Sequence, residues 1–373
     1  MIFKRYLTLA IKKKIPGFVF DIDGVLVQGS RPIPAATKAL KFLHRNKIPF
    51  VFLTNSGGLL EKEKSLQVLR KLGIEKEFPP VKTILSHTPY KALSKQFKTV
   101  FSVGPIGSSR VLREYGFEKV FEASDLIEKY KGIAPFNMVS QRKEPYVSDN
   151  AKISEDGLKF DAIMVLSDPR DWAADLQIVT DLLVSDNGKL GSLNLAKDKK
   201  TIPIFWSQRD FQWKTEYSLP RFALGAFREM IFKLFAIVKQ PELVTLPDFK
   251  QINNKEDLKS DKIEEFKILN TITEHVMGKP EPIAYQFAKK ELDKDFIEKH
   301  GHDSETEIGE IFMVGDNPLS DIIGAHRYGW STCLVKTGVY YDGYKLPVTP
   351  TMIVENVEEA VKNGCKRAQF EGH

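Results

Sequence analysis

Short apolar segments that alternate with helical segments constrain the fold of this chain most strongly. Residues 17–20 form an apolar run, and residues 48–53 form a second one. Between and after them, residues 35–46 and 61–72 carry apolar side chains at helical spacing. Strands that alternate with helices form parallel sheets built from βαβ units. The sequence therefore predicts an α/β fold with a parallel sheet.

The same alternation returns near the C-terminus and also occurs in the middle of the chain. Near the C-terminus we expect three strands and one helix, at 311–314, 331–335, 352–354 and 319–328. In the middle we expect three strands, at 99–103, 161–166 and 202–206, and three helices, at 110–115, 174–183 and 219–238. The simplest architecture is one core domain that is split by a large inserted α/β domain.

The predicted boundaries follow from this pattern. We expect a leader, a first core part, an inserted domain and a second core part, over residues 1–14, 15–85, 86–270 and 271–373. Two charged segments, 241–270 and 292–310, are interpreted as surface insertions, because a charge run is usually a solvated face.

Most of the net positive charge lies at the N-terminus. The chain has a formal charge of +6, to which Lys4, Arg5 and the three lysines at 12–14 contribute before the first acidic residue, Asp21. The remainder is nearly neutral, so the charge does not point to a nucleic-acid partner. Residues 1–14 are basic, acid-free and amphipathic, which is typical of a mitochondrial presequence. A mitochondrial protein, in the matrix, is therefore expected; the alternative is a basic tail on a cytoplasmic protein.

Other classes of protein are excluded by composition. No stretch approaches 18 consecutive apolar residues, so no transmembrane segment is expected. The two cysteines, Cys333 and Cys365, are too few for a disulfide framework or a cysteine-based zinc site.

Polar residues follow three of the expected core strands. They stand in FDIDGV, LTNSGG and VGDNPLSD, and a lysine stands in GKPEP; the residues are Asp21, Asp23, Thr54, Asn55, Lys279, Asp316 and Asp321. Each motif alone could be an ordinary loop. A parallel sheet, however, would gather the three strand ends at one edge, where ligands bind in open α/β sheets. Four aspartates there would repel one another without Lys279 and a hard cation, and such oxygen ligands suit Mg²⁺. The glycines after Asn55 expose backbone N–H groups that suit phosphate.

These four motifs, in this order, resemble the haloacid dehalogenase superfamily. The long insertion between Thr54 and Lys279 resembles class IIA, the NagD-like arrangement with a Rossmann-like core and an α/β cap. Further segments resemble the cat-eye-syndrome-critical-region type of hydrolase and its fungal mitochondrial members: SHTPYKAL, DPRDWAADLQI, GDNPLSDIIGA and LVKTGVY. The resemblance covers both the core and the insertion.

The resemblance implies a role for each core residue. Asp21 would be the nucleophile that forms an aspartyl-phosphate, and Asp23 would be the general acid and base. Thr54 and Asn55 would bind phosphoryl oxygens, and Lys279 would neutralise charge there. Mg²⁺ would be held by Asp21, Asp316 and the backbone carbonyl of Asp23, with Asp321 orienting metal-bound water.

In the insertion, the segment 206–225 would face the active site as the NagD-like substrate loop does. Arg209, Asp210 and Arg221 are its candidate substrate contacts, although each could equally form a surface salt bridge. Asp168, Arg170 and Trp172 form a similar polar cluster, whereas Trp206 and Trp213 are interpreted as cap core. Ser56 departs from the asparagine that NagD-like proteins often carry, which weakens any transfer of substrate.

The resemblance favours a Mg²⁺-dependent phosphatase of a small phosphorylated metabolite, with homodimerisation through the cap. One alternative is a catalytically silent scaffold or partner-binding protein in mitochondria. Another is a phosphomutase or phosphotransferase, which would share all four motifs.

Overall fold

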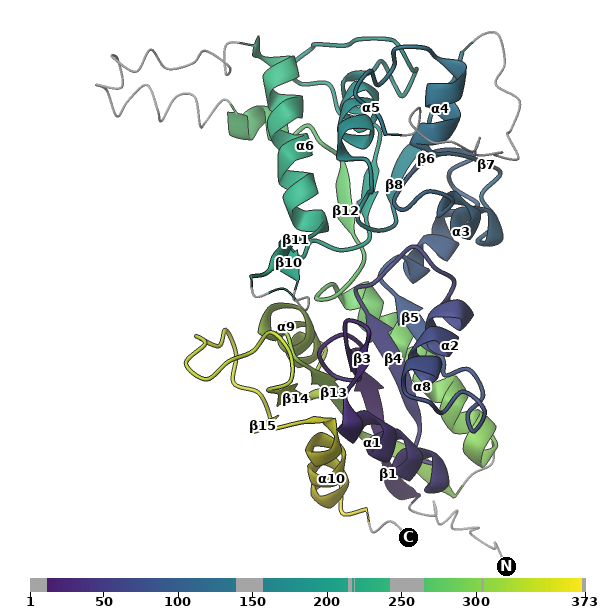
Figure 1. Ribbon diagram of the computed structural model, residues 1–373, viewed down its shortest axis with the longest axis vertical. Helices are drawn as coiled ribbons and strands as arrows, with labels where there is room; N and C mark the ends of the chain where they lie inside the picture. The colour runs from purple at the N-terminus through teal and green to yellow at the C-terminus, as the bar shows by residue number, and fades with distance from the viewer. Residues whose placement is uncertain are drawn as a thin grey trace, which may run out of the picture. The chain divides into compact units, whose positions relative to one another are not determined.

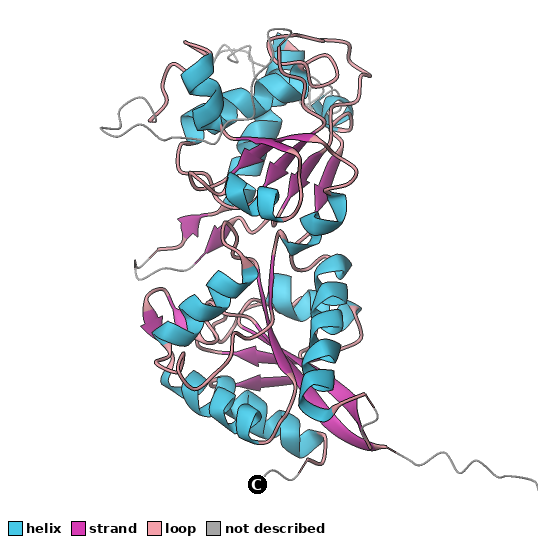
Figure 2. Ribbon diagram, turned by 90° about the vertical axis from the view of Figure 1, so that its right-hand side faces the viewer, coloured by secondary structure: helices cyan, strands magenta, loops and turns pink. Residues whose placement is uncertain are grey.

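The computed structural model describes residues 12–138, 157–213, 217, 219–241, 265–302 and 305–370. It divides into two compact units, which are considered separately. Unit 1 comprises Met1–Thr54, Glu61–Ile84 and Lys279–His373, and unit 2 comprises Asn55–Leu60 and Leu85–Gly278. Both are built from a parallel sheet flanked by helices (Figures 1 and 2). The predicted α/β fold with a Rossmann-like core and an inserted α/β domain is confirmed.

The sheet of unit 1 has six strands in the order β15-β14-β13-β1-β4-β5. Their bounds are β1 Lys13–Phe20, β4 Phe50–Thr54, β5 Thr83–Leu85, β13 Thr306–Gly315, β14 Ser331–Val335 and β15 Met352–Val354. Two short strands, β2 Val27–Gln28 and β3 Arg31–Pro32, form a hairpin. The helical segments are α1 Pro34–Arg45, α2 Glu61–Lys71, α8 Pro282–His300, the π-helical turn η4 Pro318–Ile322, α9 Ile323–Arg327 and α10 Val357–Arg367.

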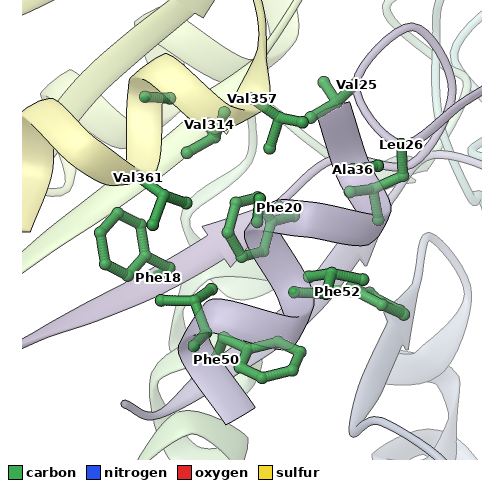
Figure 3. Packing of buried hydrophobic residues seen from close by; sticks show 14 of the residues in the cluster. Phe18, Phe20, Val25, Leu26, Ala36, Phe50, Phe52, Val314, Val357 and Val361 are labelled. Carbon is green, nitrogen blue, oxygen red and sulfur yellow. The ribbon is translucent and has the colours of Figure 1, made fainter. Parts of the chain in front are cut away.

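Alternation along β1 divides the core of unit 1 between the two faces of the sheet. Phe18 and Phe20 point to one face and pack with residues of α1 and α10, among them Val357 and Val361 (Figure 3). Val19 points to the other face, where α8 and α9 pack. Because both faces are covered, the strands are almost continuously apolar.

Unit 2 has a five-stranded parallel sheet in the order β12-β9-β8-β6-β7. Its strands are β6 Thr99–Val103, β7 Lys119–Phe121, β8 Ala162–Val165, β9 Ile204–Trp206 and β12 Glu274–Val276, with a hairpin of β10 Gln212–Trp213 and β11 Arg221–Phe222. Its helical segments are η1 Thr88–Leu93, α3 Ser109–Glu114, α4 Ala123–Lys129, α5 Trp172–Val184 and α6 Leu224–Lys239.

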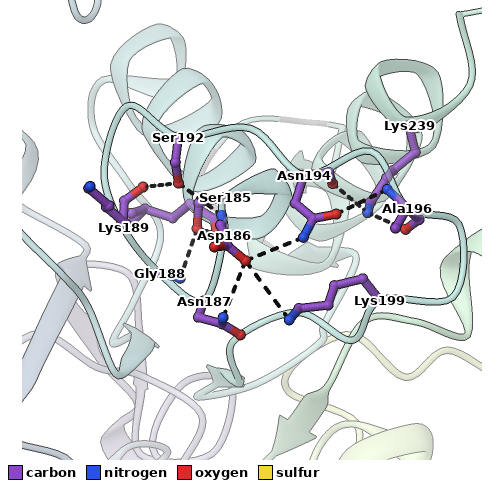
Figure 4. Close-up of polar contacts among 11 residues, drawn as sticks. Ser185, Asp186, Asn187, Gly188, Lys189, Ser192, Asn194, Ala196, Lys199 and Lys239 are labelled. Carbon is purple, nitrogen blue, oxygen red and sulfur yellow. Dashed lines mark hydrogen bonds and ion pairs between the residues drawn. The ribbon is translucent and has the colours of Figure 1, made fainter.

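The loop after α5 is held by polar contacts instead of secondary structure. The Lys239 ammonium donates to the carbonyls of Asn194 and Ala196, at 2.8 and 2.9 Å (Figure 4). The Asp186 carboxylate accepts from the Asn187 and Asn194 side chains (Figure 4). Burial lowers the pKa of Lys239, so this lysine is interpreted as a structural residue of unit 2.

Several predicted boundaries differ from the structure. β1 begins at Lys13, so residues 13 and 14 of the predicted leader lie in a strand, while residues 1–11 lie outside the described residues. β12 pairs with β9, so the chain returns to unit 1 at Lys279 and not after residue 270. The charged segment 292–310 is not an insertion but the end of α8 and the start of β13. The other charged segment, 241–270, lies mostly outside the described residues.

Two further predictions in unit 2 are wrong in part. The helix expected at 219–238 begins only at Leu224, because Arg221 and Phe222 pair with β10. Trp206 is fully buried in the core, but Trp213 is 49% exposed. Among the described residues, no helix is both long and apolar enough to cross a membrane.

Candidate active site

The carboxyl ends of β1, β4 and β13 meet at one edge of the sheet of unit 1. Phe20 is in register with Phe52 of β4 and with Val314 of β13. Asp21 directly follows β1, and its amide donates to the Val314 carbonyl at 2.9 Å. Thr54 ends β4, and Asp316 stands one residue beyond β13. The structure therefore brings together three strand ends that the motifs placed next to one another.

Lys279 is the centre of the polar contacts at this edge. Its Nζ lies 2.6 Å from Asp21 Oδ1 and 2.7 Å from Asp321 Oδ1, and it donates to the Leu53 carbonyl at 2.9 Å. The lysine is only 2% exposed. A buried ammonium needs such partners, because removing a charge from water is costly. Lys279 thus contacts a residue near the end of β4 and residues that follow β1 and β13.

Burial dominates the electrostatics of the carboxylates. It raises the pKa of Asp21 to about 7, against the attraction of Lys279, and the negative charge of Asp321 raises that pKa further. Burial, together with Asp21 and Asp321, also raises the pKa of Asp316 well above its usual value. Burial opposes the charge of Lys279, but attraction by Asp21 and Asp321 raises its pKa overall. The acidic edge thus has more negative charge than Lys279 balances.

The donor set at this edge fits a hard divalent cation. Asp21, Asp316 and Asp321 each offer a carboxylate oxygen, and these oxygens lie within 4.8 Å of one another. Carboxylate oxygens with few other protein donors are the ligands that Mg²⁺ accepts. Since burial and, after it, the neighbouring carboxylates raise the pKa values of Asp21 and Asp316, Mg²⁺ bound at these oxygens would stabilise the ionised carboxylates.

Asp316 is packed so closely that its neighbours must be glycine. A Cβ on Gly24 would lie 2.4 Å from Asp316 Oδ2, and a Cβ on Gly338 would lie 1.8 Å from it. The Val339 amide donates to the same oxygen at 2.8 Å. The sequence motifs identified Asp316 but missed the loop around Gly338; its only signal was the LVKTGVY segment of the family resemblance.

Asp321 is held between a backbone amide and Lys279. Its Oδ2 accepts from the Asn317 amide at 3.0 Å, while Oδ1 contacts Lys279. Tyr285 supports this turn, because its hydroxyl donates to the Ser320 carbonyl at 2.8 Å. These contacts favour a role for Asp321 in fixing Lys279. Sequence reasoning quoted Asn317 within VGDNPLSD without giving it a role, and it missed Tyr285, which no motif contains.

Asp23 lies at the rim of this edge. Its side chain is 48% exposed. The chain turns immediately after it, with Gly24 at a φ of +85° and the Gly24 amide donating to Val27 at 2.7 Å. Gly24 suits this left-handed conformation because it has no Cβ. A partly exposed carboxylate is accessible to a substrate in a way that the buried Asp21 and Asp316 are not.

The other predicted residues lie in unit 2. The Asn55 amide donates to Asp210 Oδ2 at 2.9 Å, and the Gly225 amide donates to the Asp210 carbonyl at 2.9 Å. Arg209 is exposed, and the Arg221 guanidinium stacks 4.7 Å from the Tyr217 ring centroid. Asp210 therefore holds Asn55 and the start of α6, which is a positioning contact.

The second polar cluster of unit 2 is also engaged internally. The Arg170 guanidinium donates to the Asp168 backbone carbonyl at 2.9 Å, and burial raises the pKa of the Asp168 carboxyl. Trp172 packs edge-to-face against Phe227, with ring centroids 5.3 Å apart. Trp172 therefore contributes to the core of unit 2.

Metal binding should reverse the pH dependence of stability. The Asp21 pKa is about 7 in the folded protein, above its ordinary value of 3.8, so the folded state binds more protons than the unfolded state between these pH values. Metal-free protein should therefore lose stability as the pH rises from about 4 to about 7. Mg²⁺ at a hundred times its Kd should restore about 2.7 kcal/mol. A fixed Mg²⁺ concentration should restore more stability at pH 8 than at pH 5, since binding needs ionised ligands.

Thermal unfolding at several pH values, with Mg²⁺ and with a chelator, measures both effects. The Asp21→Asn variant is the control, because it cannot titrate at this position and should lack the Asp21 contribution. A wild-type minus variant difference that grows with pH in the absence of metal would contradict the assignment.

Two family models match the chain. A haloacid dehalogenase-like hydrolase model covers residues 18–118, and a HAD-hydrolase-like model covers residues 276–360. The two matched ranges contain the residues gathered at the edge of the sheet in unit 1.

Curated relatives match over nearly the whole chain. A mitochondrial hydrolase of Saccharomyces cerevisiae is 37% identical over 97% of this chain and 98% of its own. A Schizosaccharomyces pombe protein described as a cardiolipin synthase (CMP-forming) / mitochondrial hydrolase fusion is 34% identical over 92% of this chain and 52% of its own.

Solved structures share the fold. A possible sugar phosphatase of Cytophaga hutchinsonii has a TM-score of 0.59 at 19% identity and covers 96% of this chain and 98% of its own. NagD of Escherichia coli has a TM-score of 0.53 at 18% identity, covering 93% and 98%. At these identities the likeness concerns architecture.

Proposed function

Because this chain belongs to the haloacid dehalogenase-like hydrolases, we propose that it is a Mg²⁺-dependent phosphatase of small phosphate monoesters. The observation that carries the proposal is the contact of Lys279 with both Asp21 and Asp321 at the carboxyl edge of the sheet. A nucleophile beside a fixed cation and an acidic metal site is what phosphoryl transfer to a carboxylate needs.

Each residue of this edge has a defined task in the proposed reaction. An Asp21 carboxylate oxygen attacks phosphorus, and the bond from phosphorus to the ester oxygen breaks, which leaves an aspartyl-phosphate. Lys279 is placed to neutralise charge on the nucleophile and on the phosphoryl group. Thr54, at the end of β4, offers a hydroxyl to a phosphoryl oxygen. Mg²⁺, when bound by Asp21, Asp316 and the backbone carbonyl of Asp23, supplies further charge neutralisation.

Asp23 completes the cycle as the general acid and base. It protonates the departing ester oxygen and then removes a proton from the water that attacks the aspartyl-phosphate. Its partial exposure supports this assignment, because the group must reach both the leaving group and water.

An Asp23→Asn variant should lose more activity on alkyl than on aryl phosphates. An alkoxide is a poor leaving group, so the acid contributes about 10²–10⁴-fold, whereas an aryl oxide needs little protonation. The kcat/KM ratios for a series of leaving groups measure this. Equal losses on both kinds of ester would remove Asp23 from the acid role.

The function is tested by phosphate release from a broad panel of phosphate monoesters, with Mg²⁺ and with chelator. Wild type and Asp21→Asn are compared in parallel. Metal-dependent release that the variant lacks would establish the phosphatase. If folded protein that binds Mg²⁺ releases no phosphate from any ester of the panel, the scaffold alternative is favoured. A scaffold should also bind its partner equally well when Asp21 is replaced by asparagine.

The acceptor of the phosphoryl group distinguishes a hydrolase from a phosphomutase or a phosphotransferase. With ¹⁸O-labelled water, a hydrolase incorporates the label into the released phosphate. A transferase with another acceptor does not.

The substrate panel should include one lipid. The fission-yeast relative contains a region similar to this chain in one polypeptide with a cardiolipin synthase. Enzymes joined in one chain often act on related compounds, so a phospholipid with a terminal phosphate monoester is a second substrate class. Exposed aromatic residues on the β10–β11 hairpin of unit 2, Phe211, Trp213 and Phe222, are compatible with an apolar ligand.

The names of the relatives and the basic N-terminal sequence support a mitochondrial location, which we place in the matrix; the cytoplasm is the alternative. Homodimerisation through unit 2 is proposed from the family resemblance alone. Import of the tagged chain into isolated mitochondria and the mass of the purified protein in solution test these two points.

A further inference from the structure

A second lysine of unit 1, Lys64, lies buried beside the proposed general acid. It stands in α2, is 9% exposed, and its Nζ lies 4.0 Å from Asp23 Oδ2. Neither a family motif nor the reaction described above uses it. A lysine is rarely buried unless it is paired, so its surroundings require an explanation.

The contact of Lys64 with Asp23 is too long to satisfy the ammonium. A direct charge-assisted hydrogen bond spans about 2.7–2.9 Å, whereas this pair is separated by 4.0 Å. Among the residues that the structure describes, Asp23 is the one ion-pair partner of Lys64, and the lysine makes no hydrogen bond to another of them. The other buried lysine of unit 1, Lys279, has three oxygen partners at 2.6–2.9 Å.

The spacing fits one oxygen atom between the two side chains. An atom at hydrogen-bond distance from both Lys64 Nζ and Asp23 Oδ2 must accept from an ammonium and donate to a carboxylate. A hydroxyl group, or the water that it would displace, does both, whereas a carboxylate or a phosphoryl oxygen can only accept. Asp23 is the more exposed of the two, with 48% of its side chain accessible against 11% for Lys64, so a ligand can reach the pair from the Asp23 side.

We propose that Lys64 is a specificity-determining residue that binds a substrate hydroxyl next to the phosphate ester, the same hydroxyl donating to Asp23. The inference rests on the proposed phosphatase activity and narrows its substrate to phosphate monoesters of polyols or hydroxy acids. Placing a neighbouring hydroxyl there aligns the ester oxygen with the acid that protonates it, which is a positioning effect.

The test compares two esters that differ by one hydroxyl, 2-hydroxypropyl phosphate and n-propyl phosphate. The wild type should prefer the hydroxylated ester in kcat/KM by about tenfold to a hundredfold, as a hydrogen bond to a charged group allows. The Lys64→Met variant should lose this preference. Lys64→Arg, which keeps the charge, should retain part of it. Lys62→Met, an exposed lysine on the same helix, should match the wild type.

Stability separates recognition from a structural role. Methionine in place of a buried, weakly paired ammonium should leave the melting temperature unchanged or higher. Loss of the preference in a folded Lys64→Met variant supports the proposal. An equal loss on both esters, accompanied by a changed pH profile, would overturn it and make Lys64 a residue that acts through Asp23. A wild type without preference would also overturn it.

A further measurement distinguishes failure of the Lys64 proposal from failure of the proposed phosphatase function. The Asp21→Asn variant binds the esters without turning them over, so the ratio of its affinities for the two esters measures the preference for the hydroxyl group directly. Preferential binding that depends on Lys64, without release of phosphate by the wild type, would keep the hydroxyl site and discard the phosphatase. Equal affinities for the two esters, together with phosphate release that depends on Asp21, would discard the hydroxyl site and keep the phosphatase.

Discussion

Replacing Asp21 with asparagine should reduce turnover of every phosphate ester by more than about 10⁴-fold, because removing the nucleophile of a covalent mechanism costs losses of this order. The fold should survive. Asp21 follows β1 and stands outside the apolar core, and Lys279 keeps Asp321 and the Leu53 carbonyl as partners. At pH 5 and without metal, where the Asp21 carboxyl is mostly protonated because its pKa is about 7, we expect the melting temperature to stay within about 3 °C of the wild type.

The measurement is single-turnover release of phosphate, together with thermal unfolding of the same samples. Asp23→Asn is the matched control, because it changes a carboxylate two residues away that is not the nucleophile. It should still form the aspartyl-phosphate from an aryl ester, and acid quenching should trap the labelled protein. Activity above background in a folded Asp21→Asn variant would exclude Asp21 as the nucleophile.

The catalytic edge could be predicted because its residues lie at strand ends. Asp21, Thr54 and Asp316 follow apolar runs that the sequence shows plainly, and parallel strands place their ends side by side. Lys279 has no such strand before it in unit 1. The need to balance four aspartates at one edge, and the order of the four motifs, indicated it. In the structure it reaches the edge because α8 begins three residues later and packs across β4.

The features of the fold and site that could not be predicted depend on contacts between residues that are remote in sequence. The loop at Gly338 encloses Asp316 through closely packed backbone and a backbone amide, and no residue type in the sequence signals such a contact. The charged run 292–310 misled the interpretation because the end of α8 and the start of β13 are only partly buried, and polar residues there form ion pairs such as Lys299–Asp295. A buried lysine such as Lys64 has the same sequence context as its exposed neighbour Lys62, so only the fold distinguishes them.

Replacing Lys279 with methionine should affect both activity and stability, and the stability effect should depend on pH. Turnover should fall by about 10²–10³-fold or more, the cost of losing one group that stabilises the charge of the transition state. The variant also leaves the carboxylates of Asp21 and Asp321 buried without their cation. Breaking a buried ion pair in this way costs about 3–5 kcal/mol.

Protonation can relieve that cost, which gives the sign of the pH dependence. The attraction of Lys279 lowers the pKa of Asp21, while burial and Asp321 raise it to about 7 in the intact site. Without the lysine, the Asp21 pKa should rise further, so the carboxyl would be neutral at pH 5 and charged only at higher pH. The destabilisation should therefore be small at pH 5 and larger at pH 8.

Urea unfolding of metal-free protein at the two pH values measures this difference. Lys41→Met is the control, because Lys41 pairs with Glu77 at the surface at 2.8 Å, and such pairs contribute about 0–1 kcal/mol. An equal loss of stability at pH 5 and pH 8 would mean that Lys279 acts through packing and not through charge. Mg²⁺ should recover stability in the Lys279→Met variant at pH 8, since a divalent cation at the same carboxylates replaces the missing positive charge.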